Sequence, residues 1–341
     1  MEKLNQTFKI NPLYEADGYK VGHPLMIAPG TTREYWTWIP RSTKYMPGGI
    51  DEIMSAGQQL VVRYIHSAFQ EFFFNQPVEV AHKFTRDVGG YLRQDYNFSG
   101  FEELHKLGYL PIRIKALPEG IFTKPNIPHM SGINTVDGYA WLGLFLETLI
   151  SKLAWQLPTS ATIGNKFKEN AVEWVLKTDK DNIWLADFMC HDFSSRGGNP
   201  FTSIAVGLGH AMSNSGSDTL NVIPASRYYY DFDEEEVPVF SVNASEHSVS
   251  TTKIFTVGEQ QMLSDWMKIF PKGILSIVAD TFDLWKLITE YLPANKDAIM
   301  ARDGKLVIRP DSGDPVDIIC GLNPMFIKNT KNGKFYHTPD D

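Results

Sequence analysis

Cysteine is scarce in this sequence, which has two, Cys190 and Cys320, among 341 residues. Two cysteines cannot build a disulfide framework, and neither stands in a closely spaced pattern with histidines that would bind a metal. A long apolar run is also lacking, because the most apolar stretch, residues 139–153, carries two charges and is too short to span a bilayer. Residues 1–12 lack the apolar run of a signal peptide. We therefore expect a cytoplasmic chain with no membrane partner.

Positive charge is in the minority. The sequence has 32 Lys and Arg against 40 Asp and Glu, for a net charge of −8. This balance argues against nucleic acid or an anionic membrane as the main partner, so an anionic ligand must be held by local cations. The chain is 43% hydrophobic and 13% aromatic, which is ample for a core. We expect a globular protein with a small-molecule ligand.

The first half of the chain mixes strand and helix patterns. Residues 31–39 and 111–116 have the composition or alternation of strands, and residues 51–75 have apolar residues at helical spacing. Two further helices are predicted at about 141–155 and 160–176, the second capped by Thr159 or Ser160. We therefore predict an N-terminal α+β domain over residues 1–157, which includes a structured arm at 11–23.

From residue 183 onward, short apolar runs alternate with polar clusters and helical stretches. This alternation predicts roughly five βα units of a parallel sheet in a second domain, residues 158–341. Ligands of such sheets bind at the carboxyl ends of the strands, so the polar clusters are the candidate site. The predicted strands lie in 183–188, 219–224, 237–243, 273–279 and 305–308.

The segment KLVIRPDSGDP, residues 305–315, is the clearest of these units. Leu306, Val307 and Ile308 suit a strand buried on both faces. The residues that follow offer a guanidinium, two carboxylates and a glycine, a mixture suited to a phosphorylated sugar and its metal. A polar turn of purely geometric role explains one such cluster equally well, but several clusters at the same rim indicate a site.

Five motifs of this region, in order, resemble the nicotinamide phosphoribosyltransferase family: HDFSSRG, SGSDT, ASEHS, DTFD and IRPDSGDP, from residue 191 to 315. The N-terminal DGYKVGH, residues 17–23, fits the opening arm of that family. The resemblance implies an irregular α/β barrel of the type II phosphoribosyltransferase kind, incomplete in this chain, beside the α+β domain. It also implies a cytoplasmic homodimer of NAD salvage that joins nicotinamide to phosphoribosyl pyrophosphate, giving nicotinamide mononucleotide and pyrophosphate.

The resemblance also implies roles in substrate binding. Phe193 would stack on one face of the pyridine ring, and Tyr19 would cover the other face from the partner subunit. Asp218 would accept a hydrogen bond from the carboxamide and disfavour nicotinate by charge repulsion. Arginines suit the phosphates or the amide-bearing ligand because they are bidentate donors. Those expected to hold them are Arg196 and Arg309. If the chain acts alone, we expect the 5′-phosphate to depend on these two arginines and on Arg41.

Three residues are implied in catalysis. His247 would be phosphorylated from ATP, a coupled activator of synthesis. Asp280 would help to organise Mg²⁺ with pyrophosphate, and Asp311 would contact the ribose or orient its neighbours. The chemistry needs no strong base, since the pyridine nitrogen is already a nucleophile, so positioning and charge stabilisation must dominate.

Plainer interpretations of the same residues stay open. Phe193 could be a core side chain, His247 a hydrogen-bonded structural residue and Asp218 an N-cap or the start of an Asx-turn. Another sugar-phosphate enzyme on a barrel, such as a lyase, is a further alternative. A Schiff-base lyase would need a lysine at a strand end, and none of the polar clusters has one.

The sequence departs from the family at its end. It stops at Asp341 without the glycine-rich segments of the GDG and GSGG kind that bind the 5′-phosphate in the family. A natural short form, one part of a split enzyme and a fragment all remain open. The alternative function is a catalytically incomplete nicotinamide- or phosphoribosyl-binding subunit, with a second chain supplying the remaining motifs. We expect such a chain to bind nicotinamide weakly, and to turn over slowly without that partner.

Overall fold

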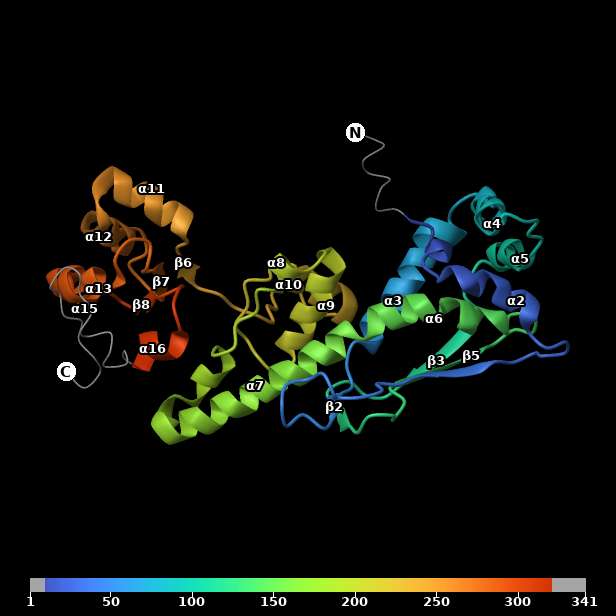
Figure 1. Ribbon diagram of the computed structural model, residues 1–341, viewed down its shortest axis with the longest axis horizontal. Coiled ribbons are helices and arrows are strands. Elements are labelled where there is room, and N and C mark those ends of the chain that lie inside the picture. The colour runs from blue at the N-terminus through green and yellow to red at the C-terminus, as the bar shows by residue number, and fades with distance from the viewer. Residues whose placement is uncertain (1–9, 321–341) are drawn as a thin grey trace. The chain divides into compact units, whose positions relative to one another are not determined.

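The computed structural model describes residues 10–320, which divide into two compact units between Phe240 and Ser241 (Figure 1). Each unit has its own sheet and its own apolar clusters. The predicted domain boundary at 157/158 falls inside the first unit, in the first turn of α7 (Gln156–Thr178). Each candidate side chain therefore belongs to one unit or the other.

The first unit opens with a short arm and a small antiparallel sheet. Strand β1 pairs with β5, and β5 pairs with β3, in the register Trp38 to Met130 and Ile112 to Asn134. A second antiparallel pair joins β2 to β4. Among the described residues its elements up to β5 are η1 (Pro12–Tyr14), η2 (Gly18–Gly22), α2 (His23–Met26), β1 (Tyr35–Trp38), β2 (Ile53–Met54), α3 (Gln58–Phe69), η3 (Gln70–Phe74), α4 (Glu79–Leu92), α5 (Gly100–Leu107), β3 (Ile112–Ala116), β4 (Phe122–Thr123) and β5 (Met130–Asn134).

Helix α3 begins later than its apolar spacing predicts. The predicted helix over 51–75 starts at Gln58, because Ile53 and Met54 pair with β4 and Gly57 turns the chain with a φ of 87° that favours glycine. The carboxylate of Glu119 accepts hydrogen bonds from the backbone N–H of Gly57 and Gln59, both at 2.9 Å. A side chain distant in sequence therefore caps this helix.

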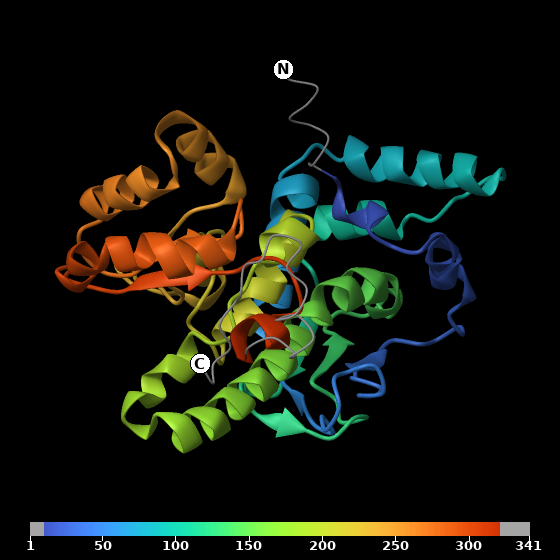
Figure 2. The same cartoon turned by 60° about the vertical axis from the view of Figure 1, so that its left-hand side comes forward.

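The rest of the first unit is helical. Its elements are α6 (Trp141–Ala154), α7 (Gln156–Thr178), η4 (Lys180–Asp187), α8 (Ser194–Gly197), α9 (Pro200–Ala211) and α10 (Val222–Tyr230). Helix α6 is buried on most sides, with Leu142, Phe145 and Leu149 in the main apolar cluster. Helix α7 packs along α9 (Figures 1 and 2). Thr159 and Ser160 lie inside α7, so their predicted role as its N-cap is wrong.

Two predicted strands of this unit are helical instead. Residues 183–188 lie largely in η4, and residues 219–224 lead into α10. In the first segment Ile183, Trp184 and Phe188 are exposed, so the apolar run is not the buried strand of a parallel sheet. Among the described residues near these two segments, strand-like pairing is limited to isolated parallel bridges, Asp192 with Ser217 and Gly216 with Phe240.

The second unit contains the parallel sheet. Its described elements are β6 (Asn243–Ala244), α11 (His247–Val257), α12 (Glu259–Ile269), β7 (Leu275–Val278), α13 (Leu284–Lys286), η5 (Leu287–Tyr291), α14 (Leu292–Ala294), α15 (Lys296–Met300), β8 (Leu306–Arg309) and α16 (Pro315–Cys320). Strand order is β6-β7-β8, and Leu275 pairs with Leu306. Met262, Leu263 and Met267 of α12 pack in one cluster with β7.

Burial in this sheet corrects one prediction. Strand β7 is buried along its whole length, as expected of the central strand. Strand β8 was predicted to be buried on both faces, but Leu306 and Ile308 are half-buried and Val307 is exposed. Among the described residues β8 pairs with β7 alone, so it stands at the edge of the sheet.

Candidate active site

The HDFSSRG motif forms a loop that is fixed to the SGSDT motif. The backbone N–H of Asp192 donates to the carbonyl of Gly216 at 3.1 Å, and the N–H of Asp218 donates to the carbonyl of Asp192 at 2.9 Å. The buried carboxylate of Asp192 also accepts hydrogen bonds from the Ser194 backbone at 2.9 Å and the Ser217 hydroxyl at 3.1 Å. These bonds bring two motifs 25 residues apart into contact.

The side chains at this junction form what we call the base cluster: His191, Phe193 and Asp218. The Nε2 atom of His191 lies 2.7 Å from Oδ2 of Asp218. The rings of His191 and Phe193 are 5.2 Å apart between centroids, with an interplanar angle of 47°. Phe193 is 53% exposed, so it is not a core side chain. The Asp218 carboxylate thus reaches a ring on another loop.

A hollow of about 370 Å³ lies beside the base cluster and is mostly apolar. His191 and Phe193 line it together with residues of α7 and α9, among them Trp155, Phe167 and His210. His210 is buried and its Nε2 lies 2.9 Å from the carbonyl of Gly216. Burial lowers the pKa of this imidazole, although the nearby charge of Asp192 opposes the shift. A neutral His210 therefore supports the loop that carries the base cluster.

Arg196 follows in α8, directly after the base cluster. Its backbone N–H donates to the carbonyl of Phe193 at 3.1 Å, and the residue is exposed. The predicted pair Phe193 and Arg196 is thus held on one turn of chain. A cation one turn from an exposed aromatic ring is a suitable position from which to contact an anionic ligand.

The predicted catalytic residues meet in the second unit and form what we call the histidine cluster: His247, Asp280, Asp311 and Ser312. His247 opens α11, Asp280 follows β7, and the other two follow β8. The Nε2 atom of His247 lies 3.1 Å from Oδ1 of Asp280, and its Nδ1 atom lies 3.7 Å from Oδ2 of Asp311. His247 is half exposed, as a residue that reacts with a ligand must be.

Asp280 is the centre of this cluster. Its Oδ2 accepts hydrogen bonds from the Asp311 backbone at 3.2 Å and from the Ser312 hydroxyl at 2.5 Å. Burial raises the pKa of the Asp280 carboxyl, but the bonds from Ser312 and His247 outweigh burial and leave the pKa lower than usual. Asp280 therefore stays ionised and fixes both His247 and the turn after β8.

Arg309 is engaged within the same unit. Its Nη2 donates to the carbonyl of Ser245 at 2.7 Å, and the hydroxyl of Ser245 accepts from the backbone N–H of Val278 at 2.9 Å. The predicted ligand-binding arginine thus braces the segment just before His247. It links the ends of all three parallel strands.

Tyr19 and Arg41 lie elsewhere in the first unit. Tyr19, in η2, is 65% exposed and its ring lies 5.3 Å from that of His23. Helix α2, which follows η2, and α8 lie well apart in the same unit (Figure 1). Tyr19 and Phe193 of one chain therefore do not meet. This arrangement is expected if Tyr19 covers the site of the partner subunit.

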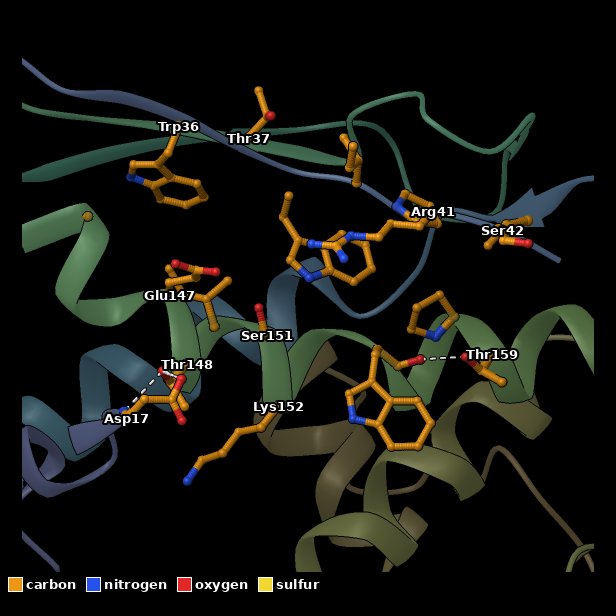
Figure 3. Close-up of a pocket in the computed structure, with 18 of the residues that line it drawn as sticks. Asp17, Trp36, Thr37, Arg41, Ser42, Glu147, Thr148, Ser151, Lys152 and Thr159 are labelled. Atoms are coloured by element: carbon orange, nitrogen blue, oxygen red, sulfur yellow. Dashed lines mark hydrogen bonds between the residues drawn. The ribbon is translucent and has the colours of Figure 1, made fainter. Parts of the chain in front are cut away.

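Arg41 lines a larger cavity, of about 730 Å³, between the chain after β1 and the helices α6 and α7. Figure 3 shows Arg41 across the cavity from Ser151 and Lys152, with Asp17 of the arm near Thr148. The Thr148 hydroxyl donates to Asp17 at 2.8 Å, which ties the arm to α6. The cavity thus combines a cation with the segment that carries Tyr19.

No group of three or more His, Cys, Asp or Glu side chains suited to a metal ion occurs within residues 10–320. The prediction gives Mg²⁺ no direct protein ligand, and it has Asp280 help to organise Mg²⁺ with pyrophosphate. Mg²⁺ is commonly held by one or two carboxylates and by substrate phosphates. Both oxygens of Asp280 already accept hydrogen bonds, whereas Asp311 is exposed and has one long contact to His247. Asp311 fits such a role better than Asp280.

Comparison with known proteins agrees with this geometry. Residues 188–338 match the model of the nicotinate phosphoribosyltransferase (NAPRTase) family, and this range contains both clusters. Over 92% of its length the chain is 34% identical to nicotinamide phosphoribosyltransferase of Acinetobacter baylyi. Residues 188–338 are thus similar to the nicotinate phosphoribosyltransferase family. A second relative of the family, nicotinamide phosphoribosyltransferase of Xanthomonas campestris, is 30% identical over 91% of this chain.

The chain spans 64% of the length of each of these two relatives. Its fold is similar to that of human nicotinic acid phosphoribosyltransferase, with a TM-score of 0.60 at 17% identity, covering 89% of this chain and 62% of that one. This confirms the predicted α/β fold of the type II phosphoribosyltransferases. Within the described residues no helix has the length and apolar character needed to cross a membrane.

Some residues with clear structural roles at the two clusters were not predicted individually. They include His191, Asp192, His210, Ser245 and Ser312. His191 and Asp192 stand inside the HDFSSRG motif, so their position was visible, but their partners were not. Only the fold shows that Asp192 holds Ser217 and that Ser312 holds Asp280.

Proposed function

We propose that this chain transfers the phosphoribosyl group of phosphoribosyl pyrophosphate to nicotinamide, giving nicotinamide mononucleotide and pyrophosphate for NAD salvage. The base cluster carries the proposal, because an exposed aromatic ring beside a carboxylate suits a planar ring that bears a carboxamide. Two of the relatives named above are nicotinamide phosphoribosyltransferases, which supports this choice of base.

Phe193 would hold one face of the pyridine ring by stacking, the arrangement that aromatic pairs prefer when offset. Asp218 would accept a hydrogen bond from the carboxamide N–H. A carboxylate ligand at the same position would meet the charge of Asp218, so nicotinate would bind less well. The pyridine nitrogen then attacks C1 of the ribose as the bond from C1 to the pyrophosphate oxygen breaks.

Cations would stabilise the departing charge. Arg196 stands one turn from the base cluster and suits a phosphate or the amide-bearing ligand. Arg309 is engaged with Ser245, so its support for the site is partly structural. Bound Mg²⁺ would neutralise charge on the pyrophosphate leaving group, with Asp311 as its carboxylate contact and Asp280 as the residue that orients Asp311.

His247 would accept the γ-phosphoryl group of ATP as its bond to ADP breaks, and water would later release that group as phosphate, which couples ATP hydrolysis to synthesis. Its Nε2 is within hydrogen-bond distance of Asp280, and a carboxylate can only accept, so the proton belongs on Nε2. In the neutral ring Nδ1 then has the lone pair. We therefore assign Nδ1 as the nucleophile, with Asp280 holding the tautomer.

The active form would be a cytoplasmic homodimer in which the sites are shared. The separation of η2 from α8 within one unit supports this, because Tyr19 can cover the ring held by Phe193 only from a second copy. Arg41, in the cavity that Asp17 also lines, would accompany Tyr19 toward the partner's substrate and contact the 5′-phosphate.

Product analysis tests the proposal. The purified chain is mixed with nicotinamide, phosphoribosyl pyrophosphate and Mg²⁺, with and without ATP, and nicotinamide mononucleotide and pyrophosphate are quantified by chromatography and mass spectrometry. We expect both products in equal amounts, and more of them with ATP. Nicotinamide binding measured by calorimetry without turnover would favour the alternative, a binding subunit that needs a second chain. Neither binding nor product would refute the assignment.

A further inference from the structure

His191 touches both proposed contacts of the base. Its Nε2 is 2.7 Å from Oδ2 of Asp218, and its ring centroid is 5.2 Å from that of Phe193. Because an ionised carboxylate has no hydrogen to give, Nε2 must be the donor. His191 therefore fixes the orientation of the Asp218 carboxylate and packs against the aromatic ring at the same time.

The ring of His191 is itself fixed. A Cβ atom added to Gly216 would lie 2.6 Å from Nδ1 of His191, so the absence of a side chain at position 216 makes room for the imidazole. The carbonyl of Gly216 is in turn held by the backbone of Asp192 and by His210. The imidazole is thus seated in a bonded loop, and only 29% of its side chain is exposed.

We propose that His191 is a positioning residue that determines the preference for nicotinamide over nicotinate; this rests on the proposed function. The two bases differ at one group, so discrimination depends on how accurately an acceptor is aimed at the carboxamide. A site built to hydrogen-bond a substrate group discriminates much more strongly than a pocket that only fits its shape. Without His191 the Asp218 carboxylate would lose the donor at Oδ2 that aims it, and both its attraction for the amide and its repulsion of the acid would weaken.

Two variants of nearly equal polarity separate positioning from general polarity. In His191→Gln the amide nitrogen reaches the place of Nε2 and keeps the donor. In His191→Asn the amide is shorter and ends near the place of Nδ1, so it cannot reach Asp218. The binding constants of nicotinamide and nicotinate are measured by calorimetry for both variants and the unaltered chain, and kcat/KM where turnover occurs.

We expect His191→Asn to lower the preference for nicotinamide about tenfold, the size expected for one hydrogen bond to a charged group. His191→Gln should retain most of the preference. In the background of Asp218→Ala, replacing His191 by Asn should change the ratio no further, since the acceptor to be positioned is gone. Thermal unfolding of each variant checks folding, and His191→Leu replaces the Asn variant if that protein unfolds.

The outcomes distinguish the two claims. If the unaltered chain binds neither base, the proposed function is wrong. If it prefers nicotinamide and a folded His191→Asn or His191→Leu variant keeps that preference, the role of His191 is wrong and the proposed function stands. Equal losses in the Asn and Gln variants would also overturn the role, because they would show that the donor at Nε2 does not matter.

Discussion

The base cluster and the histidine cluster hold their polar side chains in place in two different ways. In the second unit Asp280 and Asp311 follow β7 and β8, which pair along four residues. In the first unit His191 comes after η4, and the segments beside His191 and Asp218 pair only through isolated bridges. The histidine cluster relies on the sheet. The base cluster relies on the hydrogen bonds that the Asp192 carboxylate accepts from Ser194 and Ser217. Such a cluster can therefore form without a parallel sheet. In the first unit a buried carboxylate holds the two loops together instead.

The two clusters also differ in chemistry. The base cluster presents an aromatic ring and one carboxylate, which suits an uncharged heterocycle. The histidine cluster presents an imidazole between two carboxylates, which suits transfer of charged groups. The comparison predicts that variants in the first cluster change the choice of base, whereas variants in the second change turnover.

Asp280→Ala should have the largest effect on turnover. The substitution removes the acceptor of His247, Ser312 and the Asp311 backbone, so the whole histidine cluster loses its geometry. Misplacement of reacting groups by about 1 Å can cost on the order of 100-fold. We expect a loss of that size in kcat with the preference between bases unchanged, measured by steady-state kinetics.

Asp303→Asn is the matched control for Asp280→Ala. Asp303 is exposed, and its contact to the exposed Lys272 is long, at 3.9 Å. This variant should keep normal turnover. A normal kcat in Asp280→Ala as well would show that the histidine cluster does not act in the reaction.

Mixing two inactive chains tests whether the base cluster is completed by a second copy. Tyr19→Ala and Arg196→Ala should each be inactive alone. If the sites are shared in a twofold dimer, random mixing restores one intact site in half of the dimers, which is about a quarter of full activity. Native mass spectrometry verifies that mixed dimers form. Mixed dimers without activity would mean that each site is built within one chain.

Asp218→Asn should narrow the preference between the bases. Removing the charge ends the repulsion of nicotinate and weakens the bond to the carboxamide, so we expect the ratio of kcat/KM values to fall by about tenfold. The value of kcat for nicotinamide should change less than in Asp280→Ala. An unchanged ratio would contradict the assignment of Asp218 to base recognition.

Acid should weaken the two units in different pH ranges. Burial lowers the pKa of His129 and His210 in the first unit, so below the ordinary histidine pKa of about 6.5 the unfolded state binds more protons than the folded state. Stability of this unit falls as the pH falls through that range. The lowered pKa of Asp280 stabilises the second unit above the ordinary Asp pKa of about 3.9, and this contribution is lost only in stronger acid.

Amide hydrogen exchange followed between pH 7 and pH 4 measures this difference. Protection in the first unit should decrease earlier than in the second. His129→Gln is the control, because an amide can still bond to Thr123, which lies 2.8 Å from the imidazole, but does not titrate. Simultaneous loss of protection in both units, unaffected by His129→Gln, would contradict the role of the buried histidines.

The sequence predicts the second unit better than the first. Leu275–Val278 and Leu306–Arg309 form strands where the apolar runs indicate them, because a run of strand-forming apolar residues is a strong local pattern. Residues 183–188 have the same composition but form η4 with exposed side chains. Tertiary context decides between the two outcomes, and it is not visible in a run of six residues.

The candidate site shows the same limit. The motifs identify Phe193, Asp218 and His247 as functional candidates, since clusters of polar residues after apolar runs, and an aromatic residue within such a cluster, are visible in sequence. The bonds that orient them are not visible, because His191 and Asp218 are 27 residues apart and His247 and Asp280 are 33 apart. Pairings at such separations depend on the fold and not on any local pattern.

Competition between the two bases tests the central claim most directly. The purified chain is given equal concentrations of nicotinamide and nicotinate with phosphoribosyl pyrophosphate, Mg²⁺ and ATP, and the two mononucleotides are separated and quantified by mass spectrometry. The base cluster predicts that nicotinamide mononucleotide is the main product, and that the excess shrinks in Asp218→Asn. Nicotinate mononucleotide as the main product would contradict the account.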